Sequence, residues 1–286
     1  MTNPRSQALR IGLRRGWTEF LLSLRSPQDV WFYLFTSILA VGFLWFNRNN
    51  PIEGTELLYT HVTLPSILGA LLVFGLYVGP LSTLALERED GTLLRYKAAP
   101  HGMVGYVASQ AVYQTAQVVP SVAVILVPSM LLFDGVGPLG LRGWLTMLAV
   151  TALGILAVLP FGLIVGSLIP GSQKGGTWGM LPIMVLFGIS GIFFPISNLW
   201  GWVQALAQVF PMYWLGLGMR SAFLPDAAAA LEIGGSWRTL ETVLVLATWA
   251  VVGLTLAPRV LRRMAERQSG SQVQEARDRA LQQWVR

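Results

Sequence analysis

The stretch TLPSILGALLVFGLYVGPLSTLALERED, residues 63–90, joins a long apolar run to a cluster of charged residues. No Asp, Glu, Lys or Arg occurs from Leu57 to Leu86, whereas six such residues lie between Glu87 and Lys97. A helix needs about 20 apolar residues to cross a bilayer, and about 17 are tolerated. The run is long enough, so it predicts a membrane-spanning helix that ends at a charged segment outside the bilayer.

The same pattern recurs along the chain, which is 53% hydrophobic and 12% charged. An ordinary soluble domain is about a quarter charged, so two soluble domains would not have this composition. Further charge-free intervals cover residues 30–47, 98–133, 143–173, 175–219 and 242–258. We therefore predict an all-α polytopic membrane protein with six transmembrane helices, at about 30–47, 60–86, 102–133, 143–169, 177–196 and 240–258.

The basic residues predict the orientation of these spans. Segments between spans alternate in basic content, and one set holds all but four of the 20 Lys and Arg residues. That set contains the N-terminal segment 1–28, the loop after the second span and the tail 259–286. Cytoplasmic loops carry the excess of Lys and Arg. We expect a multi-pass protein of the cytoplasmic membrane with both termini in the cytoplasm.

The interval 175–219 is long enough for two crossings, but a seventh span would place the Arg-rich tail outside. Prolines, glycines and aromatic residues interrupt its second half, and aromatic side chains are typical of the membrane interface. We therefore expect one crossing, followed by an outer re-entrant segment or a pair of short surface helices before the last span.

An amphipathic helix is predicted ahead of the first span. Apolar residues at helical spacing form one face and basic residues the other, which is typical of an interfacial helix lying in the headgroup layer. The alternative, a continuous extension of span one, is interrupted at Ser26 and Pro27. The residues that define the two faces include Leu9, Arg10, Leu13, Arg14, Trp17 and Phe20.

Motifs for enzyme chemistry are missing from the sequence. There is no cysteine, His61 and His101 lie far apart, and no P-loop is present. Gly135, Gly137 and Gly140 fit a GxGxxG pattern, but the segment contains Pro138 and follows no strand, so we interpret them as turn residues. We expect no catalytic residue, no metal site and no bound cofactor on this chain, and no nucleic-acid partner.

Two motifs carry a family resemblance. Glu87-Arg88-Glu89, followed by Gly91-Thr92-Leu93-x-Arg95 and Pro100, resembles the signature of ABC-2 type permeases, with the drug and antibiotic branch the nearer match. The second motif, in residues 191–223, has Gly-x-x-x-Pro and then Pro-x8-Arg, and it resembles the same family's run after the fifth span.

The resemblance implies the membrane subunit of an ATP-binding-cassette exporter for a hydrophobic or amphipathic drug, antibiotic or lipid. It implies a homodimer or heterodimer of permeases, with two copies of a cytoplasmic ABC ATPase that binds ATP and Mg. A coupling helix would contact that ATPase, and the interfacial helix would lie beside it. The expected contact residues are Glu87, Arg88, Glu89, Asp90, Gly91, Thr92, Leu93, Leu94, Arg95, Tyr96, Lys97 and Pro100.

Other interpretations of these residues and of the function stay open. The charged stretch is also compatible with an ordinary positive-inside loop, although its three acidic residues would add little to topology. A polysaccharide exporter is another branch of the family. A channel or secondary carrier is a different class, but coupled carriers usually need intramembrane ionisable groups, and none is predicted here.

Spans two and five would line the substrate pathway, as the resemblance implies. Candidate residues are Phe74, Tyr77, Thr83, Trp178, Phe187, Ser190 and Phe193. On span three, polar residues also share one face. They fit either a pathway wall or hydrogen bonding between helices, and we favour the second interpretation. They are Tyr106, Gln110, Gln114, Gln117 and Ser121.

Overall fold

The computed structural model describes the chain except residues 1–3, 53–56, 170–174, 193–195, 197–198 and 268–286. The described part is almost entirely helical and contains no strand beyond an isolated bridge between Pro51 and Leu58. Five helices are long and apolar enough to cross a membrane: α2 (Pro27–Phe46), α3 (Tyr59–Glu89), α5 (Gly102–Leu132), α6 (Gly140–Leu168) and α11 (Thr239–Arg267).

Shorter helices complete the fold. α1 (Pro4–Ser23) precedes the first long helix, and α4 (Thr92–Ala98) lies between α3 and α5. The remaining elements fall between α6 and α11. They are the π-helical turn η1 (Gly175–Gly179), α8 (Leu181–Ile189), α9 (Gly201–Val209), α10 (Pro211–Phe223) and the 3-10 turns η3 (Asp226–Leu231) and η4 (Ile233–Gly235).

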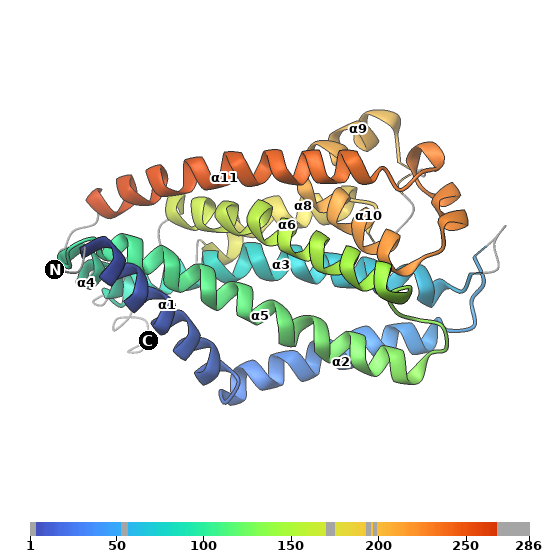
Figure 1. Ribbon diagram of the computed structural model, residues 1–286, viewed down its shortest axis with the longest axis horizontal. Helices are drawn as coiled ribbons and strands as arrows, with labels where there is room; N and C mark the ends of the chain where they lie inside the picture. The colour runs from blue at the N-terminus through green and yellow to red at the C-terminus, as the bar shows by residue number, and fades with distance from the viewer. Residues whose placement is uncertain (1–3, 53–56, 170–174, 193–195, 197–198, 268–286) are drawn as a thin grey trace, which may run out of the picture.

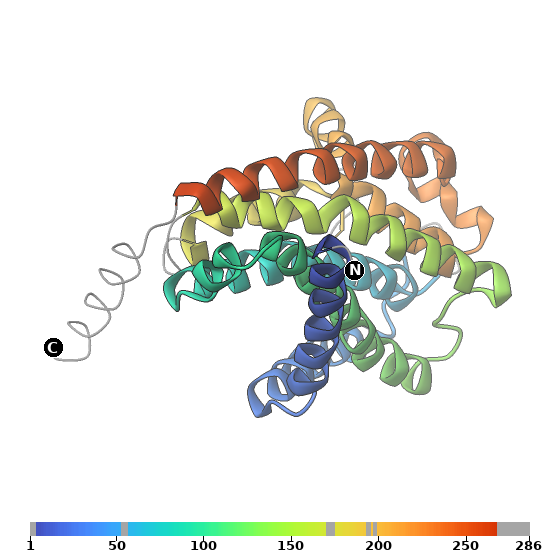
Figure 2. The same ribbon diagram turned by 60° about the vertical axis from the view of Figure 1, so that its left-hand side comes forward.

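The long helices α3, α5, α6 and α11 run lengthwise beside one another (Figure 1). α6 packs between α3 and α11, and α10 fills the space against α3 and α6. The start of α1, α4 and the last turns of α11 lie at one end of this bundle, which we name the α4 end (Figure 1). α1 runs across the bundle and packs on α5 (Figure 2).

Burial distinguishes a central helix from peripheral ones. In its most apolar window α3 is 61% buried, whereas α2 is 11% buried. α10 is buried along most of its length, although it is short. The packed centre therefore consists of α3, α6 and α10, and α2 presents its apolar side chains outward, as a lipid-facing helix does.

The expected span at 177–196 is not among the five long helices. Its apolar helix covers only Thr177–Ile189, and at 1.5 Å per residue that falls short of the roughly 30 Å hydrocarbon core. The helix ends because Gly191 adopts a left-handed conformation, with φ of 69°. Part of the expected span, including Phe193, lies outside the described residues.

Two short helices follow, where the sequence predicted a re-entrant segment or a surface pair. Extended backbone at Phe210 and the ring of Pro211 separate α9 from α10. α9 exposes Trp200 and Trp202, which stack on each other, while α10 is buried. The chain thus places an aromatic surface helix and a core helix in succession.

Candidate functional site

The candidate site is the α4 end of the bundle, where α3 stops and α4 begins. Gly91 provides the turn, because it adopts a left-handed conformation with φ of 80° that side chains rarely allow. Asp90 Oδ1 accepts a hydrogen bond of 2.7 Å from the backbone N–H of Thr92, which caps the new helix. The charged stretch therefore forms the end of α3, a turn at Gly91 and the short helix α4.

α4 has an inner and an outer face. Leu93 is fully buried against the bundle, and Tyr96 is half-buried beside it. Arg95, Lys97 and Pro100 are exposed. Lys97 Nζ donates to the backbone carbonyl of Glu266 on α11, at 3.2 Å. The helix is thus anchored by apolar contacts and presents positive charge outward.

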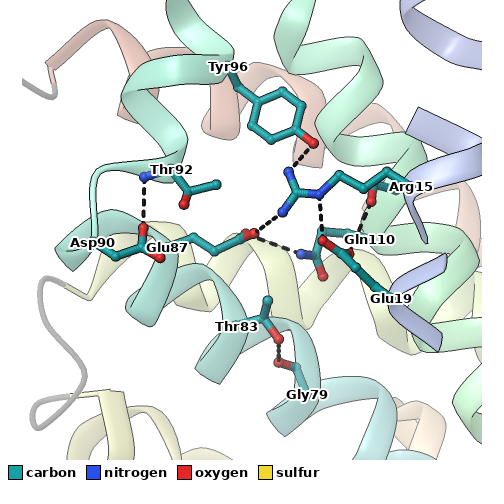
Figure 3. Close-up of polar contacts among 10 residues, drawn as sticks. Arg15, Glu19, Gly79, Thr83, Glu87, Asp90, Thr92, Tyr96 and Gln110 are labelled. Carbon is teal, nitrogen blue, oxygen red and sulfur yellow. Dashed lines mark hydrogen bonds and ion pairs between the residues drawn. The ribbon is translucent and has the colours of Figure 1, made fainter. Parts of the chain in front are cut away.

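A single arginine, Arg15, joins the three helices α1, α3 and α4 (Figure 3). Arg15 on α1 lies 2.5 Å from Glu19 on the same helix and 3.0 Å from Glu87 on α3. It also donates a hydrogen bond to the hydroxyl of Tyr96 on α4. Gln110 on α5 donates to the other oxygen of Glu87 at 3.2 Å. We name these five residues the Arg15 cluster.

The electrostatics of the Arg15 cluster follow from burial. Burial raises the pKa of Tyr96 above its ordinary value, while its contact with Arg15 opposes that rise. Tyr96 therefore stays a neutral hydroxyl that accepts from the guanidinium. Glu87 is buried, and a buried carboxylate is stable only when it is paired and hydrogen-bonded, which Arg15 and Gln110 provide.

Several predicted contact residues therefore face inward instead of toward a soluble partner. Glu87 and Leu93 are buried, and Tyr96 is turned to Arg15. Arg88 donates to the carbonyls of Ser167 and Ile169, at 3.3 and 3.1 Å, and so fastens α3 to the end of α6. The predicted contact residues that are at least partly exposed and do not point into the bundle are Glu89, Asp90, Gly91, Thr92, Leu94, Arg95, Lys97 and Pro100, of which Lys97 also bonds to α11.

The sequence interpretation missed the face by which α1 contacts the bundle. Gly12 and Gly16 lie so close to α5 that a Cβ on Gly12 would sit 2.1 Å from the carbonyl oxygen of Gly105, and one on Gly16 2.3 Å from that of Ser109. The signal was present as small residues every fourth position, Ala8, Gly12 and Gly16, a pattern typical of close helix packing in membranes.

The apolar face of α1 that the sequence predicted is largely on the outside. Leu9, Leu13 and Trp17 are exposed, and so are Arg10 and Arg14. Phe20 differs, because it is buried beside the glycine face. α1 thus packs against α5 through its glycine face and leaves its apolar face exposed outside the bundle.

Two of the five residues on the polar face of α5 bond to neighbouring helices, as the interpretation that we favoured expects, whereas Ser121 donates within α5, and among the described residues the hydroxyl of Tyr106 and Nε2 of Gln114 have no hydrogen-bond partner. Gln117 donates to Ser23 of α1 at 2.9 Å and accepts from Tyr33 of α2. Gln110 bonds to α3 through Glu87. These contacts connect α5 to α1, α2 and α3, as hydrogen bonds between membrane helices do.

The candidate pathway residues fall into separate groups. Phe74 on α3 and Phe187 on α8 meet with ring centroids 6.2 Å apart, and Tyr77 donates to the carbonyl of Gly179 at 2.9 Å. Trp178 is exposed, while Ser190 is buried and donates to the carbonyl of Phe187 in its own helix. Thr83 lies further along α3, toward the α4 end, beside Glu87 (Figure 3).

A second ionic contact lies at the opposite end of the bundle. Arg220 on α10 and Glu232 are 2.5 Å apart, with side chains 4% and 8% exposed, and Arg220 also donates to Ser66 on α3 at 3.2 Å. Glu232 lies between the 3-10 turns η3 and η4, and its side chain is nearly buried against Arg220.

Comparison with known proteins adds one match. The sequence model described as ABC-2 type transporter matches residues 15–224, which is more than half of the chain. A search of the curated proteins found no match. The matched range begins at Arg15 and includes α4 and the whole Arg15 cluster.

Proposed function

The chain belongs to the ABC-2 type transporter family, the membrane components of ABC transporters that work with an ATPase partner, and we propose that it is the permease subunit of an exporter. Its cargo in this proposal is a hydrophobic or amphipathic drug, antibiotic or lipid. ATP and Mg are bound by two copies of a separate cytoplasmic ATPase, and two permease chains form a homodimer or heterodimer.

In this proposal α4 is the contact for the ATPase. The observation that carries it is the position of α4, a short helix outside the long bundle helices whose outward residues include Arg95 and Lys97. Such cations form charge-assisted hydrogen bonds with carboxylates of a partner protein. Asp90 and Glu89 on the neighbouring turn would accept from basic residues of the same partner.

The Arg15 cluster would transmit the motion of α4 into the membrane. Leu93 and Tyr96 fix α4 to the bundle, and Arg15 connects Tyr96 to Glu87 and to α1. A displacement of α4 must therefore move Arg15, and with it α1 and the end of α3, or break the hydrogen bond between Tyr96 and Arg15. We propose that α1 lies at the membrane interface with Leu9, Leu13 and Trp17 toward lipid.

The orientation in this proposal puts the α4 end in the cytoplasm. The N-terminal segment, α4 and the end of α11 carry most of the basic residues, whereas Arg48, Arg142, Arg220 and Arg238 belong to the other end. The positive-inside rule favours this arrangement. The segment containing α8, α9 and α10 would then supply the sixth crossing and an outer re-entrant part.

The contact between α3 and α8 would form one wall of the route for cargo. Phe74, Tyr77 and Phe187 meet there, and Trp178 lies next in sequence to Gly179, the residue that Tyr77 binds. An aromatic wall of this kind suits an apolar cargo. Rocking of two permease copies about this wall would open it to alternate sides.

The proposal is tested by purifying the protein from its native membrane in mild detergent. We expect a P-loop ATPase to co-purify and candidate cargo to stimulate its ATP hydrolysis. Arg95→Glu and Glu89→Lys should each lower the stimulated rate at least about tenfold, because reversed charges meet like charges at the contact. Arg263→Glu, an exposed reversal on α11 at the same end, is the matched control.

Two results would contradict the assignment of α4 as the ATPase contact. If no ATPase accompanies the protein, or if ATPase binding and transport survive both reversals on the α4 end, α4 is not the coupling contact.

A further inference from the structure

A groove of about 350 Å³ lies beside the Arg15 cluster, open to the surface at the α4 end. α1, α2, α3 and α5 form its walls, so it is separate from the contact between α3 and α8. Thr83 lines this groove, and for that reason we assign it here and not to the aromatic wall.

The groove is negatively charged. Three carboxylates line it, from Glu19, Asp29 and Glu87, and no Lys, Arg or His is among the described residues that form its walls. Arg15 pairs with Glu19 and Glu87, but one guanidinium balances one charge. The half-buried carboxylate of Asp29 has no ion-pair partner in the described part of the chain. A cation is therefore attracted.

Among the neutral groups of the groove, Thr83 presents an acceptor. It donates its proton to the carbonyl of Gly79 at 3.0 Å, so its hydroxyl oxygen keeps its lone pairs. Ser23 donates to the carbonyl of Phe20 at 2.9 Å, but its oxygen already accepts from Gln117, and Tyr113 accepts from Gln117 as well, which leaves the O–H of Tyr113 as a donor. Thr83 and the carboxylates therefore suit a ligand that donates hydrogen bonds.

A buried amide oxygen adds an independent observation. Gln110 is 1% exposed and donates through Nε2 to Glu87, but its Oε1 has no hydrogen-bond partner among the described residues. Figure 3 shows this amide between Glu19 and Glu87, with its oxygen on the side of Thr83. These three residues line the groove, whereas Gln110 itself is not a lining residue and supports Glu87 from the bundle side. Buried carbonyl oxygens are rarely left unmet, so a donor is missing at this position.

The mouth of the groove is apolar. Leu22 on α1 lines it and is 61% exposed. In a membrane this side chain would contact acyl chains, so the ligand that fits has an alkyl part as well as a cationic head.

We infer that this groove binds the ammonium group of an amphipathic primary amine. The N–H groups are donated to Asp29 and Glu87, with Thr83 as a further acceptor. The alkyl chain lies along Leu22. The site does not depend on ATPase docking at α4, so its test stands apart from that of the proposed function.

The test is equilibrium binding of radiolabelled octylammonium at neutral pH to the full chain in phosphatidylcholine nanodiscs, with empty discs as background. We expect saturable binding that Asp29→Asn weakens about tenfold, as loss of a charge-assisted hydrogen bond does, and that Thr83→Val weakens about threefold. Glu89→Gln, which removes a carboxylate at the same end outside the groove, should leave binding unchanged.

Two further arms define the ligand. Octyltrimethylammonium, which has no N–H, should compete at least about tenfold more weakly than octylammonium. Discs of phosphatidylethanolamine distinguish the source: weaker octylammonium binding there identifies the lipid headgroup as the occupant, and unchanged binding identifies a free amine.

The inference is overturned if the protein adds no saturable binding to that of empty discs, or if Asp29→Asn and Thr83→Val, checked for native secondary structure, bind as tightly as the parent. Equal competition by the quaternary amine would also overturn it.

Discussion

At the residue scale, the contacts of Arg15 could not be predicted from the sequence. On a helical wheel it lies between the basic and apolar faces of an amphipathic helix, and nothing local marks it as internal. Its partner Glu87 is 72 positions away, inside the charged stretch that reads as exposed. Only the packing of α1 on α5 brings the two together. The chemistry of the charged stretch was therefore predictable, but its division into inward and outward residues was not.

Arg15→Leu should destabilise the protein through Glu87. Removing one partner of a buried pair costs about 3–5 kcal/mol, and we expect about 2 kcal/mol here since the arginine side chain is 31% exposed. Chemical unfolding in detergent measures the loss. Adding Glu87→Gln should restore part of it, because the unpaired charge is then gone.

Arg14→Leu is the control for this prediction, since Arg14 is an exposed neighbour on the same helix and should shift stability by less than about 0.5 kcal/mol. Equal effects of Arg14→Leu and Arg15→Leu would show that the cluster does not stabilise the fold.

The pair of Arg220 and Glu232 is more deeply buried and should respond more strongly. Arg220→Met leaves a carboxylate that is 8% exposed without its partner, which costs about 3–5 kcal/mol. The double variant with Glu232→Met should be closer to the parent than Arg220→Met alone. Thermal unfolding of the parent and the two variants measures this, and a double variant that is less stable than Arg220→Met contradicts the prediction.

At the scale of elements, apolar length predicted most of the fold. Expected spans at 60–86 and 102–133 lie within a few residues of α3 and α5, because a charge-free run marks where a helix must satisfy its backbone internally. α11 continues through Pro258 to Arg267, well past the expected end at 258. Length alone did not place the short helices α8 and α10, since α8 is too short to span by itself and α10 is buried by its neighbours.

The crossing of α1 and α5 depends on glycine. Gly12→Ala would place a methyl group 2.1 Å from the carbonyl oxygen of Gly105, and overpacking of this kind costs about 1–3 kcal/mol. Gly42→Ala on α2 is the matched control: nothing lies within 4 Å of its Cβ, so helix propensity alone should stabilise it by up to about 1 kcal/mol. Unfolding free energies should move in opposite directions, and a neutral or stabilising Gly12→Ala would contradict the packing.

At the scale of the whole molecule, the two ends of the bundle differ in charge, and this asymmetry predicts topology. The natural chain has no cysteine, so single cysteines report on one site each. In intact cells a membrane-impermeant maleimide should label Arg142→Cys, at the end opposite α4, and should label Ala98→Cys only after permeabilisation. The cysteine-free parent is the blank. The reverse labelling pattern would invert the orientation proposed for the protein.

Site-specific cross-linking tests the central claim most directly, namely that α4 is where the permease receives work from an ATPase. Ala98→Cys, at the exposed end of α4, is treated with a short photoactivatable maleimide in the native membrane, with Arg142→Cys as the control at the other end. The account predicts a cross-linked product between Ala98→Cys and a P-loop ATPase, altered by ATP, and none from Arg142→Cys. Absence of an ATPase adduct at α4, or an equal adduct from both positions, would contradict it.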